Sequence, residues 1–133
     1  MNFTSVKQSE MLLELGLPEE TADMAYIEHA TNNSAFKFDE DMPPMVLCDI
    51  PISEITANTL PCWSSGKLLE LIPLDYKQEK SLFDQSEQFT YSIIIDGHRT
   101  HENDTLIDAC VEMVSWLLEN DEDVKNYLTN YKC

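Results

Sequence analysis

Residues 103–120 read NDTLIDACVEMVSWLLEN and form the clearest helical pattern in the chain. Thr105 is suited to cap the start of a helix, and Asp108, three residues later, lies near the free amides of its first turn. The polar residues recur at helical spacing and form one narrow stripe, made of Asp108, Glu112, Ser115 and Glu119. Every other position from 106 to 118 is apolar, which predicts a core helix over 105–119.

Before this helix, the hydrophobic pattern changes to the alternation of a strand. The apolar side chains that recur at every second position from 88 to 95 are Phe89, Tyr91, Ile93 and Ile95. Asp96-Gly97 follows, and this pair favours a two-residue hairpin turn because both residues tolerate a positive φ. Residues 98–102 are then expected to return as a polar edge strand.

Shorter elements are indicated in the first half of the chain. Thr4 or Ser5 is expected to cap a helix over 4–15, and Gly16 follows it as a C-terminal cap. Pro18 is suited to the first position of a short helical turn. Residues 25–29 are expected to begin a strand.

A second short helix is expected before Pro73, capped by Ser64 or Ser65. Trp63 precedes the cap and is expected to hold the helix entry against the core. Gly66 weakens the first turn by about 1 kcal/mol relative to alanine, so we expect it to have a packing reason such as close approach to a strand.

The middle of the chain carries weaker signals. Residues 35–38 alternate like a short strand, whereas the two prolines in 39–44 exclude a central strand. Residues 45–55 are apolar but broken by a proline, which suggests an irregular connection over the core. Residues 76–88 are polar and are expected to form a loop, and residues 121–131 a last short amphipathic segment.

These patterns predict an α+β fold in a single compact domain over residues 1–133. A small antiparallel sheet, including the hairpin near 88–102, packs against the long C-terminal helix and two or three shorter helices. The residues expected in the core are Leu12, Leu15, Trp63, Leu68, Leu69, Leu71, Ile93, Ile95, Cys110, Val114 and Leu117.

Charge is the unusual feature of the composition. Twenty-five acids and eight bases give a net charge of −17, distributed along the chain with one neutral segment at 61–80. Such a surface repels nucleic acid and anionic membranes and favours a basic protein partner. The opening residues are polar and no stretch approaches 18 apolar residues, so we expect a cytoplasmic protein.

No constellation of residues indicates a catalytic, cofactor or metal site. The four cysteines show no CxxC pair, and Cys62 lies among apolar neighbours, as a core thiol does. His98 and His101 are three residues apart, so on a regular strand they face opposite sides and bind a metal together only if the hairpin is irregular. His29 has no visible orienting partner. The three glycines are too few for a phosphate-binding loop.

The stretches LELGLP at 13–18 with TADM at 21–24, PCWSSGKLLE at 61–70, and IDACVEM at 107–113 with WLLEN at 116–120 stand out as motifs. In them the sequence resembles a family of short uncharacterised proteins of Bacteroidetes, often found in phage-like or other mobile regions. Residues 25–60 and 74–104 lie outside the resemblance. It implies a cytoplasmic bacterial or phage protein, and no activity, cofactor or catalytic residue.

Three hypotheses for function follow. The first is a non-enzymatic interaction protein that presents Met45, Val46 and Leu47 to a partner. The second is a small enzyme with a cleft beside Trp63, between the hairpin and residues 61–73. The third is an acidic DNA mimic that inhibits a basic host protein, with carboxylates in line along the stripe of the main helix.

Overall fold

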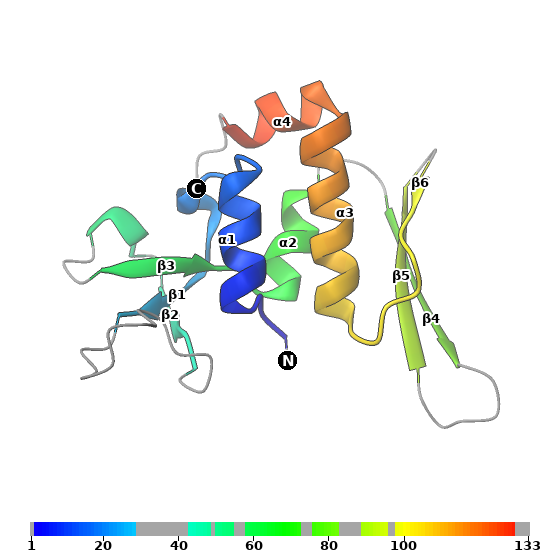
Figure 1. The fold of residues 1–133 in the computed structure, drawn as a ribbon, viewed down its shortest axis with the longest axis horizontal. Coiled ribbons are helices and arrows are strands. Elements are labelled where there is room, and N and C mark those ends of the chain that lie inside the picture. Colours follow the sequence, from blue (N-terminus) through cyan, green and yellow to red (C-terminus); the bar gives the residue numbers. More distant parts are fainter. Residues whose placement is uncertain are drawn as a thin grey trace.

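The computed structural model describes residues 2–28, 43–48, 50–54, 58–72, 76–82, 89–95 and 98–129. Within them the fold is α+β: helices stand between two antiparallel three-stranded sheets (Figure 1). The helices are α1 (Val6–Glu14), α2 (Ser65–Leu71), α3 (Leu106–Asn120) and α4 (Glu122–Thr129). The strands are β1 (Met24–Ile27), β2 (Met45–Val46), β3 (Thr59–Cys62), β4 (Tyr76–Leu82), β5 (Phe89–Ile95) and β6 (His98–Arg99).

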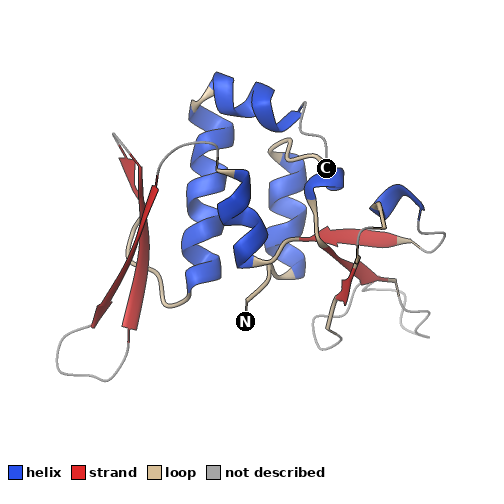
Figure 2. Cartoon of the chain, turned by 180° about the vertical axis from the view of Figure 1, so that it is seen from behind, coloured by secondary structure: helices blue, strands red, loops and turns tan. Residues whose placement is uncertain are grey.

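The main helix and its packing are confirmed. The Thr105 hydroxyl accepts a hydrogen bond from the Asp108 amide at 3.2 Å and caps α3. The Asp108 carboxylate accepts from the Gln8 side chain of α1 at 2.7 Å, so it connects two helices. Figure 2 shows α3 as the tallest helix, beside the β4-β5-β6 sheet. Ile93 and Ile95 of that sheet share the main core cluster with α3.

The predicted hairpin is present in the β4-β5-β6 sheet. Ile95 pairs with His98, so a two-residue connection joins β5 to β6; residues 96–97 themselves lie outside the described residues. The return strand is at an edge of the sheet, as expected.

The prediction of a loop over 76–88 is wrong for its first half. Tyr76–Leu82 is a seven-residue strand that pairs with β5 along its whole length. Its exposed positions carry Lys77, Gln78 and Lys80, which have low intrinsic strand preference, so the neighbouring strand decides the conformation. Residues 83–88 lie outside the described residues.

The second sheet, β2-β1-β3, was predicted only in part. The strand expected at 25–29 is β1. The strand β3 was missed because it contains Pro61, which lies opposite Ala25. The Glu28 backbone amide donates to the Asn58 carbonyl at 3.0 Å. Alternation from that pair makes Pro61–Ala25 a non-hydrogen-bonded pair, which needs no proline N–H.

The irregular connection expected at 45–55 is also partly wrong. Met45–Val46 is a short edge strand, and the chain then forms a 3-10 turn, η2 (Ile52–Glu54). The strand expected at 35–38 lies outside the described residues.

The predicted helix caps are found. Ser5 and Gln8 form a capping box at the start of α1, and Gly16 follows the helix with φ +102°. Ser64 caps α2. The packing reason expected for Gly66 is wrong, because a Cβ there would meet only the Ser64 hydroxyl, at 4.0 Å. Pro18 precedes the 3-10 turn η1 (Glu19–Thr21) at its cap position.

The predicted core is confirmed. All eleven residues belong to the main core cluster or pack against it, with Leu15 and Leu69 only partly buried. Two smaller clusters cover the two faces of the β2-β1-β3 sheet. No helix among the described residues is long and apolar enough to cross a membrane.

Candidate functional site

A buried polar cluster surrounds Trp63 at the junction of β3 and α2. The Trp63 amide donates to the Thr4 hydroxyl at 3.1 Å, and the Thr4 amide donates to the Trp63 carbonyl at 2.9 Å. The indole N–H donates to the Thr21 hydroxyl at 2.9 Å. Ser9 lies 2.8 Å from the Thr4 hydroxyl, and Tyr26 donates to the Thr4 carbonyl at 2.7 Å.

This cluster has the character of a structural element. Trp63, Thr4, Thr21 and Ser9 each have 0% exposure, and their polar atoms bond to one another. A fully buried indole does not line a solvent-open cleft, so Trp63 is not placed where the enzyme hypothesis requires it. Buried, mutually satisfied hydrogen bonds fix one packing arrangement at this junction.

The two buried thiols are placed as core residues. Burial raises the pKa of the Cys62 thiol from 9.0 to about 11, and it raises that of Cys110 to about 12. A thiol that stays protonated near neutral pH is a poor nucleophile. The expectation that Cys62 is a core residue is therefore confirmed.

The three stretches that carry the family resemblance meet in space. The indole of Trp63 bonds Thr21, and the Ser64 amide donates to the Asp23 carboxylate at 2.9 Å. The Cys110 thiol of α3 lies 3.9 Å from the Ser65 carbonyl at the start of α2. These motif residues thus connect η1, α2 and α3, and their contacts serve folding.

The return strand of the hairpin contains a β-bulge. The Thr100 amide donates to the Ile93 carbonyl in the regular register, whereas Asn103 bridges to Tyr91, two residues earlier. Residues 101–102 therefore face a single residue of β5. This irregularity brings both histidines to α3, although on a regular strand they would face opposite sides.

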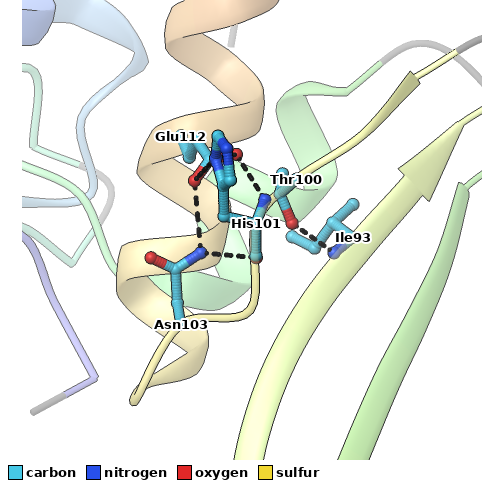
Figure 3. A network of polar contacts seen from close by, with 5 residues as sticks. All are labelled: Ile93, Thr100, His101, Asn103 and Glu112. Atoms are coloured by element: carbon cyan, nitrogen blue, oxygen red, sulfur yellow. Dashed lines mark hydrogen bonds and ion pairs between the residues drawn. The ribbon is translucent and has the colours of Figure 1, made fainter.

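Each histidine contacts α3 at a different turn. His98 stacks on Trp116 with ring centroids 3.9 Å apart. One turn earlier, Glu112 accepts from the His101 amide at 2.7 Å, and the His101 ring nitrogen Nδ1 lies 3.3 Å from the carboxylate (Figure 3). Asn103 adds a bond to the same carboxylate at 3.4 Å. The arrangement fixes the bulge to the helix.

This cluster does not assemble a metal site. Within the part of the chain that the structure describes, no three His, Cys, Asp or Glu side chains lie close enough to share an ion. The His101 side chain is 93% exposed. His29 lies outside the described residues.

The acidic stripe of α3 is mostly engaged in internal contacts. Asp108 accepts from Gln8, and Glu112 accepts from His101. Of the three aligned carboxylates, Asp108 and Glu112 are partly buried and Glu119 is exposed. A DNA mimic needs rows of carboxylates that face solvent, which this helix does not provide.

An apolar edge stands out at β2. Val46 is 63% exposed and Ile50 is 50% exposed, while Leu47 between them is 4% exposed. The prediction that Leu47 faces a partner is therefore wrong: it packs with Ala25 and Ile52 under the sheet. Ile50 replaces it on the surface, because the chain turns at Cys48, whose φ is +45°.

Comparison of the chain with protein-family models, with curated proteins and with solved structures found no match. The function is therefore inferred from the chain's own side chains.

The sequence did not predict that Ile50 is exposed or that a bulge brings both histidines to α3. The apolar residues of 45–55 were visible, but nothing in their order showed which of them the turn at Cys48 would expose. The bulge depends on Glu112, which is distant in sequence from the strand it holds.

Proposed function

We propose that the protein is a non-enzymatic, cytoplasmic interaction protein of a bacterial phage or mobile element, and that it binds a protein partner along the β2 edge. The phage or mobile-element origin rests on the family resemblance alone. The binding surface rests on one observation, the exposure of Val46 and Ile50 on a segment whose neighbours Leu47 and Ile52 are buried. Buried neighbours hold the two apolar side chains in place before a partner arrives, which reduces the entropy lost on binding.

The backbone of β2 supports binding of an extended segment. The Leu47 amide donates to the Asp23 carbonyl at 3.0 Å, and β2 continues antiparallel to β1 from that pair. Alternation therefore directs the N–H and C=O groups of Val46 away from β1. A partner strand can add to this edge through those groups and place apolar side chains against Val46 and Ile50.

The charge near this edge supports a partner with basic residues. The turns η1 and η2 lie against each other, and they bring Glu19, Glu20 and Glu54 to the surface near the segment. The net charge of −17 acts in the same direction at longer range. The partner that fits best is an extended apolar segment with lysine or arginine at its ends.

The test begins with affinity capture from host lysate, followed by titration of the recovered partner in purified form. Replacing both Val46 and Ile50 with Ser is expected to weaken binding by about tenfold or more, because two apolar contacts are lost. Val46→Pro removes the outward N–H without breaking a bond to β1, and should weaken binding as well.

The matched control is the double replacement of Met11 and Tyr127 with Ser. These side chains are 39% and 48% exposed and lie on α1 and α4. Their loss should leave the affinity unchanged. A partner that binds the Val46/Ile50 variant as tightly as the parent contradicts the proposed surface, and recovery of no stoichiometric partner contradicts the proposed function.

A further inference from the structure

The outer strand of the other sheet, β4, has features that the β2 edge lacks. It is a seven-residue edge strand, long enough to be a template for another strand. The described strands β4, β5 and β6 carry Lys77, Lys80 and Arg99 against the single acid Glu79, so this sheet is basic within a strongly acidic chain.

The neighbouring strand shows which backbone groups of β4 point outward. Ile93 bonds through both its amide and its carbonyl to Thr100, on the β6 side. Gln78 lies opposite Ile93, so the two form a pair without mutual hydrogen bonds. The amide and carbonyl of Gln78 therefore point to the free edge, and by alternation so do those of Tyr76 and Lys80.

These directions restrict how two copies of β4 can pair about a two-fold axis. The axis must pass through a residue. An axis between two residues would place a residue whose backbone N–H and C=O point outward opposite one whose groups point back to β5. Axes at Lys77, Glu79 or Lys80 place like charges directly opposite each other, which destabilises a pair of strands. An axis at Gln78 places Lys77 opposite Glu79 of the second copy, twice.

The charges on the open face of the sheet agree with this register. Glu79 and Arg99 are 3.0 Å apart and both lie on the face turned away from α3. In a pairing about Gln78, Lys77 of the second copy comes beside Glu79 on that same face. Glu79 would then lie between two cations, one from each chain.

We propose that two copies of this chain associate through antiparallel pairing of β4 about Gln78, which joins the two β4-β5-β6 sheets across a two-fold axis. This inference is independent of the function proposed for the β2 edge. Pairing of residues 76–80 forms about six backbone hydrogen bonds between the chains. An isologous contact of this kind closes on itself, because it uses the β4 edge of both copies.

The dimer is expected to be weak and salt-dependent. The contact is smaller than a standard interface, so we expect a dissociation constant on the order of 100 µM. The long-range repulsion between two chains of net charge −17 opposes association at low salt. Salt at about 0.3 M screens that repulsion more strongly than the contact pairs, so the dimer should strengthen with salt in this range.

Sedimentation equilibrium on the full chain tests the proposal, from about 10 µM to 1 mM protein in 0.3 M salt. Lys77→Glu and Glu79→Lys should each weaken association by about tenfold or more, because each sets like charges opposite across the axis. Mixing the two single variants should restore association as a heterodimer, since every opposed pair is then complementary. The mixing experiment requires both variants to be folded, and a cooperative thermal unfolding transition of each variant shows this directly.

Two further variants separate the register from other causes. Gln78→Pro removes an outward N–H but no bond to β5, so it should abolish association and keep the fold. Lys7→Glu makes the same change in net charge as Lys77→Glu at an exposed site on α1, and association should persist. A parent chain that stays monomeric to 1 mM overturns the proposal, as does a mixture of the two charge variants that forms no heterodimer.

Discussion

The two sheets each have three described strands, but they are stabilised by different contacts. The β2-β1-β3 sheet has short strands, but both of its faces are covered, by α1 on one side and by Leu47 and Ile52 on the other. The β4-β5-β6 sheet has two seven-residue strands and packs one face on α3. Figure 1 shows no described helix over its other face.

The difference shows two ways to stabilise a small sheet. In the first sheet, tertiary cover and buried hydrogen bonds hold strands that are too short to be stable alone. In the second, a long ladder and one apolar face suffice, and Lys77 and Arg99 on the other face are exposed to water. The first sheet should therefore depend on single buried contacts, and the second on the helix behind it.

The largest effect should come from removing what the sheets share. Leu117 of α3 is 1% exposed and belongs to the cluster that contains both Trp63 and Ile93. Leu117→Ala should lower the free energy of unfolding by about 2–5 kcal/mol, since it leaves a cavity in this core. Denaturant unfolding measures the change, and a transition unchanged from the parent would contradict the architecture.

A matched pair of substitutions compares the sheets directly. Thr4→Val leaves the Trp63 amide and the Ser9 hydroxyl without their partner, and should cost about 2–3 kcal/mol. Thr100→Val removes only the side-chain acceptor of the Ile93 amide, and should cost about 1 kcal/mol. Valine is close to threonine in shape, so a cavity contributes little to either value.

Equal losses of unfolding free energy in the two variants would show that the polar cluster around Thr4 stabilises the fold no more than the Thr100 side chain does. The same denaturant titration gives both values. A greater loss for Thr100→Val would show that the β4-β5-β6 sheet, and not the β2-β1-β3 sheet, depends more on single buried hydrogen bonds.

Alkaline pH should destabilise the folded chain through its buried thiols, with a smaller effect than Leu117→Ala or Thr4→Val. The pKa of Cys110 is 9.0 when exposed and about 12 in the folded chain, because burial opposes the thiolate. The folded state keeps a proton that the unfolded state releases between pH 9 and 12, so stability is complete below pH 9 and falls as pH rises through this window. The Cys110 contribution to the loss between pH 8 and 10 is about 1 kcal/mol.

Urea unfolding of the parent and of Cys110→Ala at both pH values isolates this term. The variant should lose less stability on going to pH 10 than the parent does, whatever its stability at pH 8. An identical loss in the two proteins would show that the thiol is not shielded from solvent when folded.

The smallest effect should come from the bulge. Glu112→Ala removes the acceptor of the His101 amide at a partly exposed site, and should cost about 1 kcal/mol or less. Glu112→Gln keeps an acceptor and should cost less. Amide chemical shifts of 101–103 should change more in Glu112→Ala than in Glu112→Gln. Equal changes would show that the bulge does not depend on this side chain.

The sequence predicted what is decided locally. The α3 helix has its cap at Thr105 and its apolar face within one segment, and the hairpin has its alternation and turn within another. The strands β3 and β4 were missed because their own residues disfavour strands: Pro61 in one, and Lys77 with Lys80 in the other. Their conformation comes from pairing with β1 and β5, which local pattern does not show.

The candidate surface was predicted in the same uneven way. Hydrophobicity placed an apolar segment near Val46, but the identity of the exposed residues depends on the turn at Cys48. Leu47, which was expected at the surface, is buried, and Ile50, for which nothing specific was expected, is exposed. Likewise, the polar partners of Trp63 come from residues distant in sequence, Thr4 and Thr21.

Hydrogen exchange of single amides by NMR tests the contrast between covered and open edges most directly. In dilute protein, the amides of Thr4 and Trp63 should exchange only on global unfolding, and Leu47 should exchange far more slowly than Val46. Along β4, Lys77 and Glu79 should be protected and Gln78 should not. Protection of Val46 equal to that of Leu47, or uniform protection along β4, would contradict the two open edges on which both proposed surfaces depend.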